Sequence, residues 1–314
     1  MEGKVRLFLE NLKKIDLFFG AGARQTGGRV AVKLAAKGMS FSAKEYEEIV
    51  DTIKANTKWY QKIRTNKQLQ QLYYTQFAGQ PQKVEQALIY QKSMKAGGEG
   101  SYRAAMYIKE EGQISKIKDV QEALKKKPGM KWSSVSYASL AMLAGRPESA
   151  EELAMAYGHY YGRLADFSWK SDRKGKVAAI LLTIATGNFN QSIWERVGLL
   201  SKLVMEEYGP NLYFYEIVCL LALAQIEPET LPGLYEMHNV IMEETDGRSL
   251  GNAALLLAAQ LYTSDASFAG LLPDGQSFDV DYLDLAMSVI DGAFDGDGGS
   301  GGDGGGDGGG GGGE

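Results

Sequence analysis

The feature that most constrains the fold is a two-part helical unit that recurs along the chain. A short helix of Ala and Leu comes first, a tight turn follows, and an amphipathic helix comes last. In the clearest copy the apolar helix covers 137–144 and the turn covers 145–148, with glycine at the C-terminal cap position and proline beyond it. The stripe of the second helix, at helical spacing, consists of Leu153, Tyr157, Tyr160 and Leu164.

Similar units occur both before and after this copy. Their turns are marked by Gly38, Gly79, Gly112, Gly145, Gly187 and Gln225, which are 41, 33, 33, 42 and 38 residues apart. The apolar helices need burial on both sides, whereas their partners have one polar face, so the pairs form an inner and an outer layer. The sequence therefore predicts an all-α protein of stacked antiparallel helical hairpins, an α-solenoid or an α/α-toroid. The open superhelix and the closed ring both remain compatible with it, and an irregular helical bundle is the alternative.

The C-terminal segment has a different composition. Residues 295–314 are 20 residues long and hold 14 glycines and five acidic residues, and no apolar residue follows Phe294. Such a segment cannot bury enough apolar surface to offset its ordering entropy, so we expect a disordered tail after one helical-repeat domain over 1–294. Without the tail the chain has 34 basic and 34 acidic residues. This balance argues against a nucleic-acid-binding protein, which needs a basic excess.

Cysteine content and hydropathy bear on the compartment. The only cysteine of the sequence, Cys219, lies in an apolar run and is expected to be a buried thiol without a disulfide. The longest apolar runs, near 177–186 and 215–224, are about half the length that a membrane-spanning helix needs. We therefore expect a cytoplasmic protein without membrane insertion.

The sequence contains no sharp catalytic, cofactor or metal motif. Its two histidines, His159 and His238, are 79 residues apart, and adjacent carboxylates such as Glu151 and Glu152 fit solvated helix faces. The glycine-rich segment 20–29 lacks the Lys-Ser or Lys-Thr pair of a phosphate loop, and Gln25 takes the place of the last glycine of a dinucleotide fingerprint. We interpret this segment as a flexible helix–helix connection and expect no cofactor and no metal.

Two groups of residues are candidates for binding. Trp59 and Arg64 lie at a helix end rather than in a periodic stripe, and Trp and Arg are enriched in binding hot spots. A tryptophan that caps a loop explains Trp59 equally well. His159, Tyr160 and Tyr161 are consecutive and form the second group, which is expected to line a groove.

The chain also resembles a known family. The resemblance rests on Asn-Thr-Lys-Trp-Tyr-Gln-Lys-Ile-Arg at 56–64, Leu-Ala-Met-Leu-Ala-Gly at 140–145 and Leu-Leu-Ala-Leu-Ala at 220–224. These elements are similar to an uncharacterised all-helical family, a domain of unknown function, of Gram-positive bacteria. The resemblance covers roughly Val5 to Thr263 and implies a bacterial, cytoplasmic helical protein, without assigning an activity. The glycine–aspartate tail departs from it.

Two functions follow from this architecture. The first is a non-catalytic helical-repeat module that binds a protein or peptide along a helix face. The alternative is an α/α-barrel enzyme that uses paired carboxylates. An enzyme of this kind needs a deep pocket lined by several Asp or Glu side chains with shifted pKa values, whereas a binding module needs a shallower groove.

Overall fold

The prediction of an all-α protein is confirmed. The computed structural model describes residues 2–20, 24–95, 97–127, 135–209, 211–245, 250–251 and 253–266. Within these ranges the regular secondary structure consists of α-helices and short 3-10 helices, with no strand. The 3-10 helices are η2 (Lys62–Arg64), η3 (Leu164–Phe167) and η4 (Pro228–Thr230).

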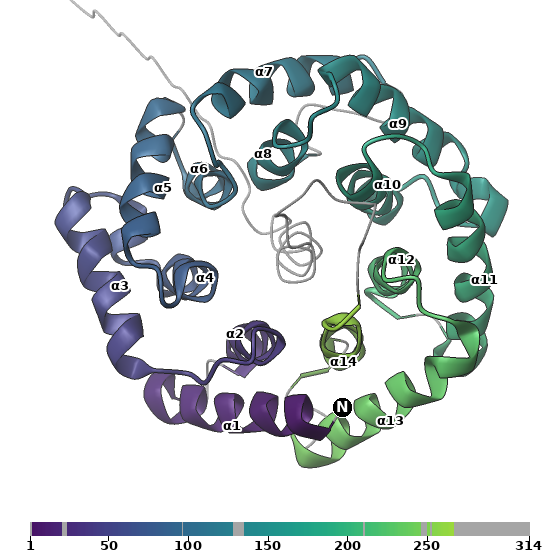
Figure 1. Ribbon diagram of the computed structural model, residues 1–314, viewed down its shortest axis with the longest axis horizontal. Helices are drawn as coiled ribbons and strands as arrows, with labels where there is room; N and C mark the ends of the chain where they lie inside the picture. The colour runs from purple at the N-terminus through teal and green to yellow at the C-terminus, as the bar shows by residue number, and fades with distance from the viewer. Residues whose placement is uncertain are drawn as a thin grey trace, which may run out of the picture.

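The α-helices form two concentric layers (Figure 1). The outer layer consists of α1 (Glu2–Phe19), α3 (Ala43–Asn56), α5 (Gln82–Ser93), α7 (Gly112–Lys125), α9 (Ala150–Gly162), α11 (Gln191–Tyr208) and α13 (Leu231–Glu244). The inner layer consists of α2 (Arg24–Ala36), α4 (Lys67–Phe77), α6 (Glu99–Ala105), α8 (Tyr137–Ala144), α10 (Arg173–Thr186), α12 (Phe214–Leu223) and α14 (Ala253–Thr263). Outer and inner helices therefore alternate along the chain.

The two layers close into a ring. Each inner helix packs on the next, α14 packs on α2, and α13 packs on α1. The approach at the closure is tight, because a Cβ atom added to Gly28 of α2 would lie 2.9 Å from Leu250 Cδ2 and 3.3 Å from Leu257 Cδ1. Of the two arrangements that the sequence left open, the described helices thus form the closed one.

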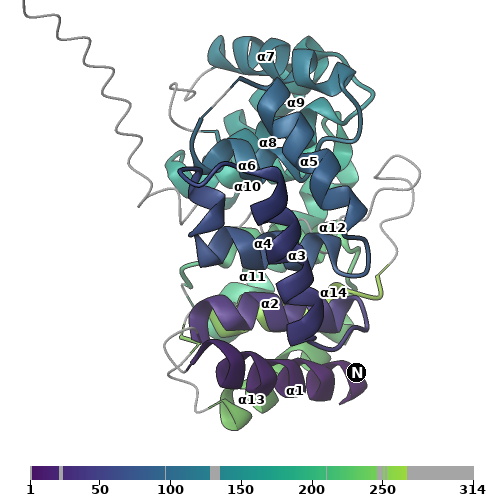
Figure 2. The same cartoon turned by 90° about the vertical axis from the view of Figure 1, so that its left-hand side faces the viewer.

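All inner helices run in the same direction. Lys37, after α2, donates to the Thr75 carbonyl of α4 at 2.6 Å, which places their C-terminal ends together. Gln113 donates at 2.6 Å to the Ala141 carbonyl in the last turn of α8 and at 3.0 Å to Tyr107, just after α6. We call the end where the inner helices begin the amino end of the ring, and the opposite one the carboxyl end. In side view the outer helix α3 crosses the direction of α2 and α4 (Figure 2).

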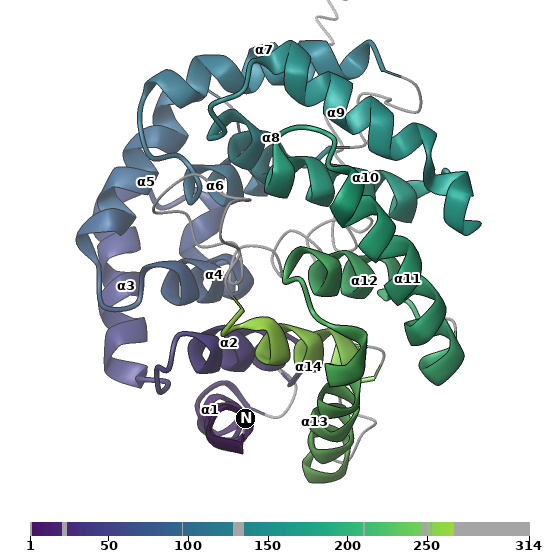
Figure 3. The same cartoon turned by 45° about the vertical axis from the view of Figure 1, so that its right-hand side comes forward.

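Burial follows the expected division between the layers. Every residue from Val177 to Ala185 of α10 is buried, as are all residues from Glu216 to Leu223 of α12. Figure 3 shows α10, α12 and α14 inside the arc of α11 and α13. Cys219 is fully buried in α12, as its apolar neighbours predict.

Residues 24–29 of the glycine-rich segment are helical rather than part of the flexible connection that we expected. The helix α2 begins at Arg24, so Gly27 and Gly28 are helical. A Cβ at Gly27 would lie 2.9 Å from Ile15 Cγ2 of α1. These two glycines are therefore explained by close helix packing, which outweighs their low helix propensity.

Four of the six predicted turn residues adopt positive φ at the end of an inner helix, and the other two do not. Gly38, Gly79, Gly187 and Gln225 end inner helices with positive φ, as a left-handed C-terminal cap requires. Gly112 instead begins α7, and Gly145 has right-handed helical dihedrals. The inner helix before Gly112, α6, ends at Ala105.

Other expectations lie outside the described residues. They include the tail and the boundary at 294, which stay predictions. Within the described ranges no single helix is long and apolar enough to cross a membrane. Two consecutive segments, 214–223 and 228–244, satisfy the length and composition criteria only as a pair that is bent by 116°.

Candidate binding groove at the ring closure

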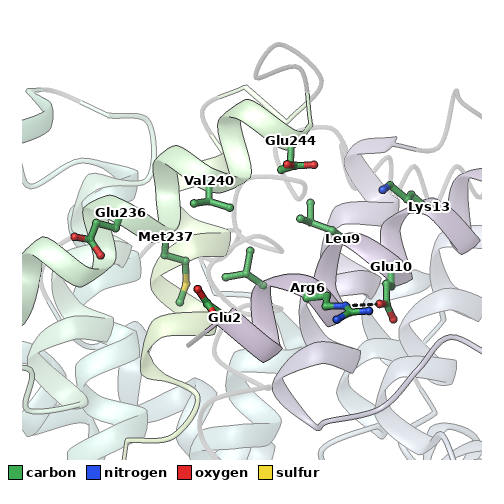
Figure 4. Close-up of a pocket in the computed structure, with 10 residues that line it drawn as sticks. Glu2, Arg6, Leu9, Glu10, Lys13, Glu236, Met237, Val240 and Glu244 are labelled. Atoms are coloured by element: carbon green, nitrogen blue, oxygen red, sulfur yellow. Dashed lines mark hydrogen bonds and ion pairs between the residues drawn. The ribbon is translucent and has the colours of Figure 1, made fainter.

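A groove lies where the first and last outer helices, α1 and α13, meet (Figure 4). It has a volume of about 530 Å³. The lining residues are Glu2, Val5, Arg6, Leu9, Glu10 and Lys13 of α1, and Glu236, Met237, Val240 and Glu244 of α13. Among the residues that the structure describes, no other segment contributes to this lining.

The floor of the groove is apolar. Val5 and Met237 are only 7% and 3% exposed and also belong to the core of the ring. Leu9 is half-buried, and Val240 is 43% exposed. Val5 and Leu9 are four residues apart, so they lie one above the other on α1, and together with Met237 and Val240 they make a continuous apolar strip.

The rim of the groove is charged. Arg6 Nε donates to Glu10 Oε1 at 3.0 Å, and both side chains are largely exposed, so this pair contributes little to stability. Glu2, Glu236 and Glu244 carry three further negative charges, against one positive charge on Lys13. The rim as a whole is therefore acidic.

The groove has the chemical character of a helix-binding surface. It combines an apolar strip between two helices with carboxylates at its edges, the surface that an amphipathic helix recognises. Within the described ranges, no group of three or more His, Cys, Asp and Glu side chains is placed to hold a metal ion.

The first pair of predicted binding residues lies elsewhere, in the connection between α3 and α4. Trp59 is 82% exposed and packs edge-on against Tyr60, with ring centroids 5.8 Å apart. Arg64 Nη1 donates to the carbonyl oxygens of Lys54 and Thr57, each at 2.7 Å. Arg64 therefore holds the connection, and Trp59 is the exposed member of the pair.

The second predicted group lies on α9, in another sector of the ring (Figure 1). Tyr160 is fully buried, and its hydroxyl accepts from the Asn190 amide at 2.9 Å. Tyr161 donates to the Ser171 carbonyl at 3.0 Å, and His159 is exposed with its ring edge-on to Phe189. The three residues do not line a common groove, because consecutive helical residues point in different directions.

The groove residues themselves were missed from the sequence. The buried stripe of α1 consists of Val5, Phe8, Leu12 and Ile15, and Leu9 lies beside this stripe. An apolar residue next to a complete stripe is a weak signal, because single exposed apolar residues are common on protein surfaces. Only the closure of the ring brings Leu9 next to Val240.

One buried carboxyl group lies away from the groove. Glu216 of α12 has zero exposed surface, and its burial raises its pKa to about 7. Lys174 and Asp172, at the start of α10, influence the pKa in opposite directions and more weakly than the burial does. A carboxyl with this pKa could transfer a proton at neutral pH, but a substrate cannot reach a side chain without exposed surface.

Comparisons with known proteins add no relative: no family model, no curated protein and no solved structure matches this chain. The resemblance to an uncharacterised bacterial family therefore stays a prediction.

Proposed function

We propose that this protein is a non-catalytic helical ring that binds a basic amphipathic helix of a partner protein in the groove between α1 and α13. The observation that carries the proposal is the apolar strip formed by Val5, Leu9, Met237 and Val240 between acidic edges. A helix laid between two helices covers such a strip with residues spaced i, i+3, i+4 and i+7.

The size of the groove fits a helix better than a small molecule. Its residues extend over three turns of α1, from Glu2 to Lys13, and over two turns of α13, from Glu236 to Glu244. The volume of about 530 Å³ accommodates a few large apolar side chains projecting from one helix face. Leu, Ile or Phe side chains at these positions would remove the exposed part of Val240 from water.

The charges at the edges determine which helix fits. Glu2, Glu236 and Glu244 favour a partner with Lys or Arg beside its apolar stripe. Complementary charges raise the association rate and reject acidic competitors more than they raise the affinity. The proposed partner is therefore a positively charged amphipathic segment.

The alternative, an enzyme that uses paired carboxylates, has less support. The carboxyl whose pKa lies near neutrality, that of Glu216, has no exposed surface. The carboxylates of the groove stand at its exposed edges, where water screens their charges. Neither arrangement gives two converging carboxyl groups in a desolvated cleft, so we favour binding.

Fluorescence anisotropy tests the proposal with a labelled peptide of about 18 residues, five helical turns, that carries leucines at i, i+3, i+4 and i+7 and lysines beside them. We expect saturable binding to the full chain and at least a tenfold loss in the double variant Leu9→Asp/Val240→Asp. The variant Glu236→Lys/Glu244→Lys should weaken binding more at low than at high salt.

Two controls make the result specific. A peptide with glutamates in place of the lysines should bind at least tenfold more weakly, and Met155→Asp, an exposed residue of α9, should leave the affinity unchanged. Equal binding of both peptides, or unchanged binding by the Leu9/Val240 variant, would contradict the proposal.

A further inference from the structure

The two ends of the ring differ in their exposed apolar side chains. At the amino end, Trp59 and Tyr60 are 82% and 62% exposed in the α3–α4 connection. Tyr137, the first residue of α8, and Leu212, just before α12, are 38% and 40% exposed. Among the described residues, the connections at the carboxyl end contain no exposed large apolar side chain.

Contacts place the α3–α4 connection at the amino end. Asn66, which caps α4, donates to Glu99, the first residue of α6. Tyr60 lies near Tyr102 of α6, whose pKa is raised by burial and, more weakly, by the phenol of Tyr60. The exposed Trp59 and Tyr60 rings thus stand next to the start of an inner helix.

The two ends also differ in charge. Three connections at the amino end, α3–α4, α5–α6 and α9–α10, carry basic side chains together with the first helical turns that follow them: Lys58, Lys62, Lys67, Lys95, Lys170, Arg173 and Lys174. The acidic side chains of these connections and first turns already have partners: Glu99 accepts from Asn66, Asp166 is paired with Arg163, and Asp172 accepts from the amides of Lys174 and Gly175. The exposed acidic residues of the carboxyl-end connections are Glu110, Glu111, Glu227 and Glu229.

The basic character is strongest around Trp59. No acidic residue occurs in the sequence between Asp51 and Glu85. Lys58 Nζ lies 5.9 Å from the centre of the Tyr60 ring. The parallel inner helices also direct the positive ends of their dipoles toward this end of the ring.

The aromatic connection is held in place rather than loose. Besides the two hydrogen bonds of Arg64, the Gln61 side chain accepts from the Lys58 amide at 2.6 Å, and the Gln61 amide donates back to the Lys58 carbonyl at 3.0 Å. The buried Thr57 hydroxyl donates to the Ile53 carbonyl at 2.5 Å. Fixing an exposed tryptophan in this way lowers the entropy that is lost on docking.

We propose that the amino end of the ring docks onto the surface of an anionic phospholipid bilayer, with Trp59 and Tyr60 in the headgroup region and the surrounding lysines and arginine on lipid phosphates. Trp and Tyr favour the membrane–water interface because an apolar ring and a polar edge fit that region. Basic residues add electrostatic attraction to anionic lipids.

The distribution of these side chains favours a bilayer over another polyanion. Trp59, Tyr137 and Leu212 belong to different sectors of the ring (Figure 1), so a planar partner can reach them together. A single nucleic-acid strand follows a groove and stacks its bases on aromatic rings, whereas a leucine such as Leu212 offers no stacking surface. An acidic peptide would engage the lysines near Trp59 and leave the distant sectors unused.

Vesicle co-sedimentation of the full chain tests the proposal. Vesicles of phosphatidylcholine alone are compared with vesicles that also contain phosphatidylglycerol. We expect binding to the anionic vesicles only, and we expect salt to weaken it, since surface charges are screened within about 10 Å at 0.1 M salt. Trp59→Ala/Tyr60→Ala should lower the partition coefficient at least fivefold. Lys58→Ala/Lys62→Ala should lower it about 25-fold, since each basic residue near the surface contributes about fivefold.

Matched controls and a spectroscopic measurement complete the test. Met155→Ala and Lys118→Ala, both exposed on outer helices, should partition like the unmodified chain. Brominated lipids should quench the tryptophan fluorescence of the unmodified chain more than that of Trp59→Phe. Circular dichroism checks that each variant keeps its helices.

Three results would overturn the proposal. One is equal binding to neutral and anionic vesicles, or no binding to either. Another is unchanged binding by both the aromatic and the lysine variants. The third is preferential binding of an oligothymidylate, lost in the same variants, because this result would reassign the face to single-stranded nucleic acid.

Discussion

The guanidinium of Arg146 forms a two-point ion pair with the carboxylate of Glu148, with Nη2–Oε1 and Nε–Oε2 distances of 2.8 and 3.1 Å. Only 5% of the Arg146 side chain and 15% of the Glu148 side chain are exposed. Arg146 Nη1 also donates to the Ala185 carbonyl in the last turn of α10, at 3.3 Å. The α8–α9 turn is thereby fastened to the carboxyl end of the neighbouring inner helix.

Removing one member of this pair should destabilise the ring strongly. We expect Arg146→Ala to lower the free energy of unfolding by about 3–5 kcal/mol, because Glu148 would keep a buried charge without its counter-ion. Urea denaturation followed by circular dichroism measures the change. The exposed pair of Arg6 and Glu10 is the control, and Arg6→Ala should cost about 0.5 kcal/mol or less. Similar losses in the two variants would contradict the assigned role.

The same ion pair makes Gly187 sensitive to substitution. Gly187 has φ of +69°, and a Cβ atom there would overlap the Glu148 carboxylate and the Arg146 guanidinium. We expect Gly187→Ala to cost about 2 kcal/mol or more, since backbone strain and steric overlap add. Gly112→Ala is the matched control, because its Cβ would meet no atom within 4 Å. A thermal shift that is equal for both variants would rule out this explanation.

The ring closure gives a third prediction. Gly28→Val should destabilise the chain by about 1–3 kcal/mol, because the added methyl groups would crowd Leu250 and Leu257 where α2 meets α14. Gly3→Val in α1 introduces the same side chain where no atom lies within 4 Å of the Cβ position. Urea midpoints distinguish the two, and a midpoint of Gly28→Val at or above that of Gly3→Val would be evidence against a closed ring.

The sequence predicted the layers better than it predicted the closure. Helices such as α12 are apolar on all sides, and this pattern alone predicts that they lie in the inner layer. It also predicts that Cys219 is buried, as the structure shows. The contact between α14 and α2 joins residues more than 200 positions apart, and no local pattern encodes it. Gly28 marks that contact, yet in the sequence it reads as part of a flexible glycine-rich segment.

The binding surfaces likewise divide into residues that a local pattern identifies and residues that only long-range contacts bring together. Trp59 was identified because it interrupts a helical pattern, and its exposure makes it available to a partner. The periodic stripe of its helix is equally compatible with Tyr160 being a core residue, and in the structure Tyr160 is buried in the core. Leu9 and Val240 become neighbours across the groove only through the long-range contact of α1 with α13. A local sequence pattern identifies a residue that departs from helical periodicity. A surface formed by two segments distant in the sequence can be identified only once the fold is known.

Glu216 should make stability depend on pH in the neutral range. Its pKa in the folded state is about 7, raised by burial from the ordinary value of 4.5. Below the lower value the carboxyl is protonated in both the folded and unfolded states. Between pH 4.5 and 7 the unfolded state loses the proton first, so stability falls as the pH rises. The total loss is on the order of 3 kcal/mol and is complete above the folded-state pKa.

The variant Glu216→Gln isolates this effect because its amide does not ionise. Relative to the unmodified chain, its free energy of unfolding should rise between pH 4.5 and pH 8, and urea denaturation at several pH values measures the difference. Glu206→Gln, at an exposed position of α11, is the control for the loss of a surface carboxylate, and at pH 8 it should change the free energy of unfolding less than Glu216→Gln does. If the Glu216→Gln curve stays parallel to that of the unmodified chain over this range, the carboxyl of Glu216 does not have the raised pKa that its burial implies.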